Sequence, residues 1–116
     1  MHVAFGDHQV ANVAAEVEAR TIGAATNVGY LAPGRHWAVD PTWGIPTFSG
    51  SWDGSGFVYW DSGTPTPPNG NIPPEAGSDP HGHPRASRLA RLQKSLFLRT
   101  DGAVVDVCDG APCRSR

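Results

Sequence analysis

The sequence lacks any run of apolar residues close to the length of about eighteen that a transmembrane helix requires. Its first residues also lack the basic segment and the small-residue cleavage site of a signal peptide. Neither sign of charge dominates, because the net charge is -2 and the isoelectric point is about 6.2. We therefore expect a soluble chain without a signal peptide, and no electrostatic attraction to nucleic acid or to an anionic membrane.

Apolar residues are also scarce, at 39% of the 116 residues, whereas glycine and proline are abundant, with 14 and 11 copies. A chain of this length has room for one domain, so we expect a single unit over residues 1–116 with a small core. The glycine and proline content predicts that much of the backbone is loop.

Hydrophobic spacing predicts the regular elements. Val10, Val13 and Val17 recur at helical spacing, and Gly23 follows them as a left-handed cap. Later in the chain, four consecutive β-favouring residues, 57–60, predict a buried strand. In order, we expect a strand at 2–5, a helix at 10–22, a strand at 56–61, a helix at 87–100 and a last short strand at 103–107.

The last of these helices is predicted to be amphipathic. Ser87 is its expected N-cap. Its apolar face is predicted to consist of Leu89, Leu92, Leu96 and Phe97. Its solvated face is predicted to carry Arg85, Arg88, Arg91, Lys94 and Arg99.

Two long loops separate the elements. The first, residues 30–55, contains Trp37, Trp43 and Trp52, and we expect these rings to anchor it. The second, residues 62–84, is rich in proline and glycine, so it either crosses a surface or is shaped by a site that it serves.

The order of strands and helices is typical of an α/β sheet with parallel strands. Two or three strands and two helices cannot cover both faces of such a sheet. We therefore expect a homo-oligomer, in which a second copy supplies the missing part of the core.

Two pairs of segments resemble a known family. Residues 3–10, followed by 19–23, are similar to the penultimate-strand region of large secreted bacterial α/β-hydrolase-like proteins of the serine esterase or lipase type. Residues 79–85, followed by 93–98, are similar to the histidine loop and last helix of the same proteins. The resemblance implies a truncated α/β-hydrolase-like fold with two or three strands and two helices, completed by oligomerisation, and an exported parent protein.

In that family the acid of a catalytic triad follows one strand and the histidine follows the next. The resemblance therefore implies that Asp7 is the acid and His81 the base, with His83 as the alternative base. Loops that follow parallel strands meet at the same sheet edge, so the two side chains can approach although 74 positions separate them. Without the resemblance, Asp7 is interpreted as a helix-capping carboxylate and His81 as a hydrogen-bonded loop residue.

The family's nucleophile is absent. No serine has glycines at both positions of a Gly-x-Ser-x-Gly elbow, and none of Ser49, Ser51 and Ser55 opens a predicted helix. A mechanism through an acyl-serine is therefore not available within this chain.

A metal-bound water is a second route to hydrolysis. His81 and His83 form a His-x-His pair whose imidazoles share one face in extended backbone, and His8, Asp79 and Asp7 are candidates for further ligands. Zinc or another divalent metal with an open position would lower the pKa of its bound water to about 7. The alternative interpretation of Asp-Pro-His-Gly-His-Pro is an ordinary polar turn.

Cys108 and Cys113 enclose a turn-forming segment that can bring two sulfur atoms within disulfide reach; the alternative is two free thiols in a frayed tail. Taken together, the sequence predicts a small hydrolase of ester or phosphoester bonds, acting on a small-molecule substrate through metal-activated water or a histidine base. The alternative is a catalytically inactive hydrolase fragment that associates with itself. A third and weaker option is an aromatic-rich binding module.

Overall fold

The computed structural model describes all residues, 1–116, and contains three helices and six short strands. In chain order the elements are β1 (His2–Ala4), α1 (Asn12–Ile22), β2 (Thr26–Asn27), β3 (Thr47–Phe48), β4 (Ser51–Trp52), β5 (Val58–Trp60), α2 (His83–Ala86), α3 (Arg88–Phe97) and β6 (Val104–Val105).

The strands form three separate two-stranded sheets. β1 and β5 are parallel, β2 and β3 are parallel, and β4 and β6 are antiparallel. The prediction of a truncated α/β-hydrolase-like sheet is therefore wrong. The physical reason is that the strands are only two or three residues long, and 22 of the 41 backbone hydrogen bonds lie in turns, loops and caps instead.

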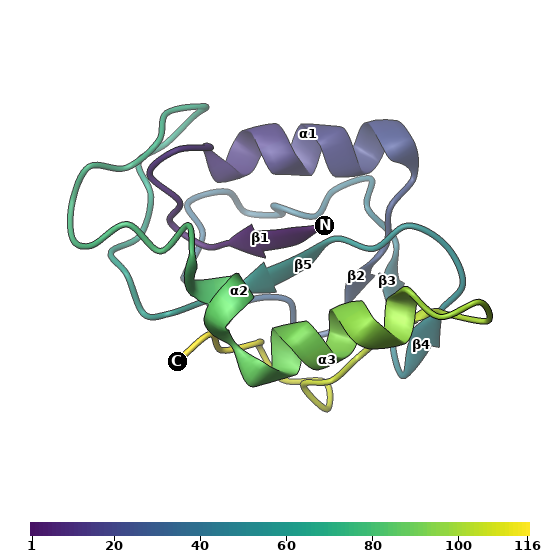
Figure 1. Cartoon of the computed structure of the whole chain (residues 1–116). Helices are drawn as coiled ribbons and strands as arrows, with labels where there is room; N and C mark the ends of the chain where they lie inside the picture. The colour runs from purple at the N-terminus through teal and green to yellow at the C-terminus, as the bar shows by residue number, and fades with distance from the viewer.

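The helices lie on opposite sides of the β1–β5 pair (Figure 1). Alternate strand residues point to the two sides, so each side has its own core. On the α1 side, Phe5 and Tyr59 pack with Ala19. On the α3 side, Val58 and Trp60 belong to the other cluster.

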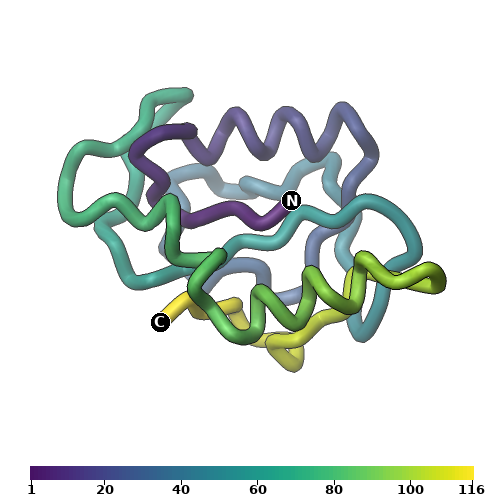
Figure 2. The backbone as a smooth tube through the Cα atoms, viewed as in Figure 1, coloured from purple at the N-terminus to yellow at the C-terminus, as the bar shows by residue number.

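Long loops surround this centre, as the backbone trace shows (Figure 2). The segment between β5 and α2 contains neither helix nor strand, in agreement with its proline and glycine content. The expectation that tryptophans anchor the earlier loop is wrong for Trp43, which is 72% exposed, whereas Trp37, which is 42% exposed, packs beside His36. None of the helices is long and apolar enough to cross a membrane.

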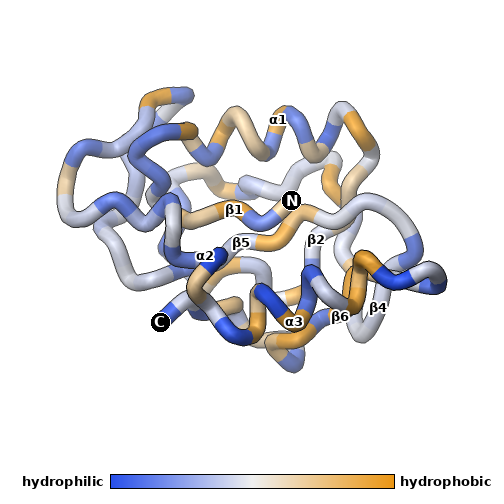
Figure 3. Tube along the Cα trace, viewed as in Figure 1, coloured by the Kyte–Doolittle hydropathy of each residue, from blue (hydrophilic) through white to orange (hydrophobic).

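The orientation of α3 differs from its sequence prediction. Ser87 accepts a hydrogen bond from the backbone of Ala90, as an N-cap does. The residues that α3 buries are Ala90 and Gln93, whereas Leu89 and Leu92 of the predicted apolar face are exposed. Hydrophobic positions of α3 therefore lie at the surface (Figure 3).

Gln93 is buried because it has two hydrogen-bond partners. Its Nε2 atom donates to the carbonyl oxygen of Val105 at 2.6 Å, and its Oε1 atom lies 2.8 Å from Nε2 of His2. The side chain thereby joins α3 to both β6 and β1, so a satisfied polar residue takes the inward position.

Candidate active site

The turn after β1 positions Asp7. Gly6 has a positive φ of 77°, and a side chain there would meet Thr64, so the position requires glycine. Asn12 accepts from the Gly6 amide and donates to the carbonyl oxygen of Ala4, both at 2.8 Å. The first residue of helix α1 therefore holds the turn in place. The Asp7 carboxylate lies beside this turn and is almost fully buried.

The loop before α2 positions His81. Asp79 accepts hydrogen bonds from the Gln9 side chain and from the backbone amides of His8 and His81. These hydrogen bonds, that of Gln9 first, lower the pKa of Asp79 to about 2. The carboxylate is therefore charged at neutral pH and ties the histidine loop to the turn that carries Asp7.

Asp7 and His81 meet across the ends of β1 and β5. Oδ2 of Asp7 lies 2.8 Å from Nδ1 of His81, and Oδ1 accepts from the amides of Gln9 and Val10. A carboxylate only accepts, so Nδ1 of His81 carries a proton, and in the neutral form of the ring Nε2 has a free lone pair. No protein atom is hydrogen-bonded to that Nε2. Asp7 is not a helix cap, because the N-cap of α1 is Ala11; its carboxylate holds the loop before the helix and is the partner of the histidine.

Both side chains line a cavity of about 510 Å³. Its wall comes from β1, β5, α2, α3 and β6, and it includes the apolar side chains of Ala4, Val58 and Phe97. The volume is within the range of about 300–1,000 Å³ that is typical of small-molecule sites. An oriented imidazole with a free nitrogen therefore stands beside a space that a small substrate can enter.

The remaining predicted metal ligands do not gather around His81. No three His, Cys, Asp or Glu side chains are close enough together to hold a metal ion. His83 instead lies with Nε2 at 3.4 Å from a guanidinium nitrogen of Arg116. The metal site stays a prediction from the sequence.

No hydroxyl or thiol nucleophile joins the pair. The cavity wall contains no serine, threonine or cysteine. An acyl-serine or acyl-cysteine route is therefore not available in this cavity.

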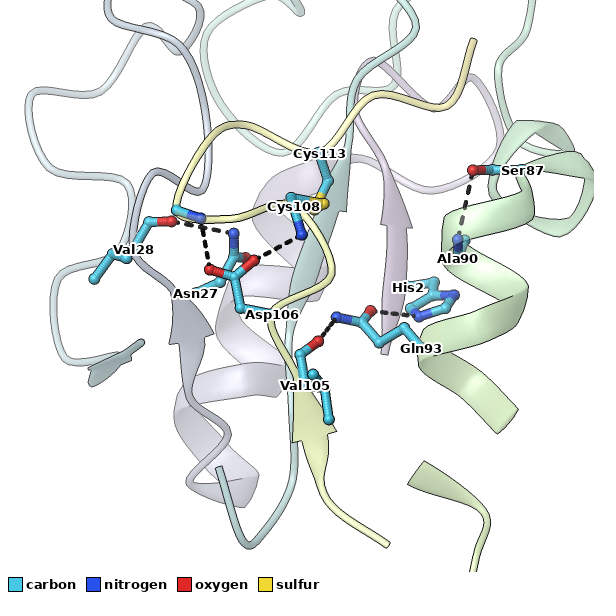
Figure 4. The surroundings of a disulfide bond; sticks show 11 residues. His2, Asn27, Val28, Ser87, Ala90, Gln93, Val105, Asp106, Cys108 and Cys113 are labelled. Atoms are coloured by element: carbon cyan, nitrogen blue, oxygen red, sulfur yellow. Dashed lines mark hydrogen bonds between the residues drawn. A yellow bond between two sulfur atoms is a disulfide. The ribbon is translucent and has the colours of Figure 1, made fainter. Parts of the chain in front are cut away.

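The two cysteines form a disulfide (Figure 4). Asp106 organises the enclosed turn by accepting from the amides of Cys108 and Gly110, at 3.0 and 2.9 Å. The carbonyl oxygen of Cys113 accepts from the amide of Asp61, which follows β5. The disulfide therefore closes the turn within the tail, and this backbone hydrogen bond joins the tail to the residue that follows β5.

His2 is a cavity residue to which the sequence analysis assigned no role. Its ring lies edge-on to Trp60 and hydrogen-bonds to Gln93 (Figure 4). Burial lowers the pKa of His2 to about 4, so the ring is neutral at neutral pH. A polar residue in the centre of a predicted apolar helix face, here Gln93, was the only sequence signal for this contact.

A second carboxylate–histidine pair lies in the core. Glu16 of α1 accepts from Nε2 of His36 at 2.8 Å and from the hydroxyl group of Tyr59. The backbone amide of Ala38 donates to Nδ1 of His36, so that both ring nitrogens have partners. The imidazole of this pair therefore has no free nitrogen, and the sequence analysis assigned no role to the cluster.

Comparison with protein-family models, with curated proteins and with solved structures finds no match. The resemblance to secreted bacterial hydrolases therefore stays a prediction from the residues that carry it.

Proposed function

We propose that the protein is a small hydrolase of ester bonds, in which His81 acts as a general base on water. The observation that carries the proposal is the 2.8 Å contact between Asp7 and Nδ1 of His81, which leaves Nε2 free beside the cavity. Histidine is the side chain that most often serves as a general base in enzymes.

The groups support a direct water mechanism. A water molecule on Nε2 of His81 gives up a proton as its oxygen attacks the ester carbonyl carbon. The Asp7 carboxylate stabilises the imidazolium that forms, as the acid of a triad does. The carbon–oxygen bond to the alcohol then breaks, and His81 returns the proton to the leaving alkoxide, so that an acid and an alcohol are released.

A phosphoester substrate or a metal-bound water remains a variant of this proposal. His81 can offer only Nε2 to a cation, because Nδ1 is occupied by Asp7. The general-base route has its groups in place within hydrogen-bonding distance, and the metal route needs ligands that are not gathered. The experiment below separates the two.

The test is hydrolysis of activated aryl esters and aryl phosphates by purified protein, with and without a chelator. We expect His81→Ala to lower the rate about 100-fold or more, which is the usual contribution of a general base. His83→Ala is the matched control, since His83 lies outside the cavity wall, and should retain activity. A rate indifferent to His81→Ala would refute the proposal, and loss on chelation with recovery in zinc would establish the metal route.

A second candidate function is self-association without catalysis. It is favoured by the absence of a nucleophile, by the single neighbour of strand β1 and by the exposed Leu89 and Leu92 of α3. An open strand edge and apolar side chains at the surface are both covered by a second copy in many oligomers.

Sedimentation equilibrium tests the assembly. We expect a dimer or larger species that Leu92→Gln shifts toward monomer, while Val39→Gln, in a fully exposed loop position, has no effect. A well-folded monomer at all accessible concentrations would contradict self-association and leave the hydrolase proposal intact.

A further inference from the structure

The cavity wall carries two cationic side chains without counter-ions. Arg85 of α2 and Lys94 of α3 both line it. Neither takes part in any of the four ion pairs of the protein. Asp7 is the only acid of the wall, and its oxygens already accept from His81 and from two loop amides.

Apolar side chains adjoin these cations. Phe97 and Leu98, at the end of α3, line the same cavity and remain 45% and 72% exposed. Val58 and Val104, which are buried, form a deeper part of the wall. Exposed apolar side chains beside a cavity are a common sign of a surface that a ligand covers.

We infer that this cavity binds an amphipathic anion. An aliphatic chain covers Phe97 and Leu98, while a carboxylate or phosphate group is held by Arg85 and Lys94. A guanidinium and an ammonium group form charge-assisted hydrogen bonds with such a group, which are stronger than bonds between neutral partners. A neutral ligand of the same length fills the cavity but leaves both cations unpaired.

The inference deepens the proposed function and rests on it for the identity of the substrate. A hydrolase with this site acts on aliphatic esters that also carry an anionic group. Binding of the anion itself does not require His81, so the two proposals can fail separately.

Binding is measured first, near neutral pH, by calorimetry with decanoate and with decanol as ligands. The protein is the unmodified chain, because neither ligand contains an ester bond that could be hydrolysed. We expect decanoate to bind about tenfold more tightly than decanol. Equal affinity for the two would overturn the inference.

Variants assign the preference to the two cations. Replacing both, as Arg85→Gln with Lys94→Gln, should weaken decanoate about tenfold and leave decanol unchanged. The matched control is Arg88→Gln with Arg91→Gln, which removes the same charge from α3 outside the cavity wall. An equal loss of decanoate affinity in the control would show a diffuse electrostatic effect and overturn the inference.

Further measurements distinguish an amphipathic anion from a free inorganic anion, and a small-molecule ligand from a second copy of the protein. Decyl phosphate should bind more tightly than inorganic phosphate, because only the former covers the apolar wall; equal binding would overturn the role of the chain. Decanoate affinity that falls as protein concentration rises would assign the cavity to a second copy instead. Anion-selective binding without ester hydrolysis by the unmodified protein would refute the hydrolase proposal alone.

Discussion

The protein contains two carboxylate–histidine pairs with the same 2.8 Å contact, and their surroundings give them different capacities. In the core pair, Glu16 and His36 have side chains that are each 5% exposed. In the cavity pair, the side chain of Asp7 is 9% exposed but that of His81 is 33% exposed. The contact distance therefore does not distinguish a reactive pair from a structural one.

The distinction lies in the second ring nitrogen. The Ala38 amide donates to Nδ1 of His36, and the same histidine donates from Nε2 to Glu16. Nδ1 of His81 donates to Asp7, and its Nε2 has no protein partner. A histidine with both nitrogens used can only hold the fold, whereas one with a free nitrogen beside a cavity can also move a proton.

The core pair should dominate stability. Glu16→Leu removes the acceptor of both Tyr59 and His36 and leaves two buried donors unsatisfied. We expect the free energy of unfolding to fall by about 3 kcal/mol, because each unsatisfied buried group costs about 1–3 kcal/mol. Urea unfolding followed by tryptophan fluorescence measures the loss.

Two controls accompany this substitution. Glu16→Gln keeps one acceptor oxygen and should lose less than half as much stability, while the exposed Glu18→Gln should change little. An unchanged free energy of unfolding for Glu16→Leu would contradict this prediction. It would show that apolar packing of leucine compensates fully for the lost hydrogen bonds.

The cavity pair should dominate activity. Asp7→Asn keeps an oxygen for the amides of Gln9 and Val10 but presents an NH₂ group to His81. An NH₂ group can only donate, so Nδ1 of His81 becomes the acceptor and Nε2 carries the proton. We expect ester hydrolysis to fall about 100-fold, since the base is lost.

The same substitution should cost less than about 1 kcal/mol of stability, because the hydrogen bonds to the loop amides of Gln9 and Val10 are retained. Ester hydrolysis and urea unfolding of the same preparation give the two numbers. Equal activity of Asp7→Asn and the unmodified protein would show that the pair does not act as an oriented base.

Local patterns predicted the elements that carry the pairs. The strand residues at 2–5 and 56–61 and the helix after Asp7 stand where hydrophobic spacing places them, and Gly23 ends α1 with a φ of 68°. The arrangement of the strands was not predictable in this way. Two-residue strands such as β3 and β4 form because they pair with distant segments. Such short strands show no alternating hydrophobic pattern in the sequence from which they could be predicted.

The inward face of α3 was also beyond local reasoning. Amphipathic spacing favours burial of Leu89 and Leu92, but Gln93 is buried because Val105 and His2 supply its partners from elsewhere in the chain. The Asp7–His81 contact followed from the resemblance and from the common edge of parallel strands. The core pair and the cavity cations had no comparable signal.

A third prediction concerns His2, whose imidazole ring is held neutral in the cavity wall. Its pKa in the folded protein is lowered from the ordinary value of 6.5 to about 4, chiefly by burial. Below 6.5 the unfolded chain binds a proton that the folded protein does not, so stability falls as pH is lowered from 6.5 to about 4. We expect a loss of about 1–2 kcal/mol, because solvent screens a group that is partly exposed.

Urea unfolding as a function of pH measures this slope. The matched variant is His2→Gln, whose amide can donate to Gln93 but does not titrate. A slope that is the same with and without His2 would contradict the assignment.

The smallest expected effect sharpens the contrast within the core pair. Tyr59→Phe keeps the buried ring and removes one of the two donors to Glu16, so we expect a loss of about 1 kcal/mol.

Burial, together with the negative charge of Glu16, raises the pKa of Tyr59 well above its ordinary value of 10.0. The unfolded chain therefore releases this proton at lower pH than the folded protein, and stability due to Tyr59 is present below pH 10.0 and is lost as pH rises above it. The unmodified protein should thus lose more stability in alkali than Tyr59→Phe does, as measured by urea unfolding, and an identical alkaline slope would show that Glu16 does not hold this hydroxyl group protonated.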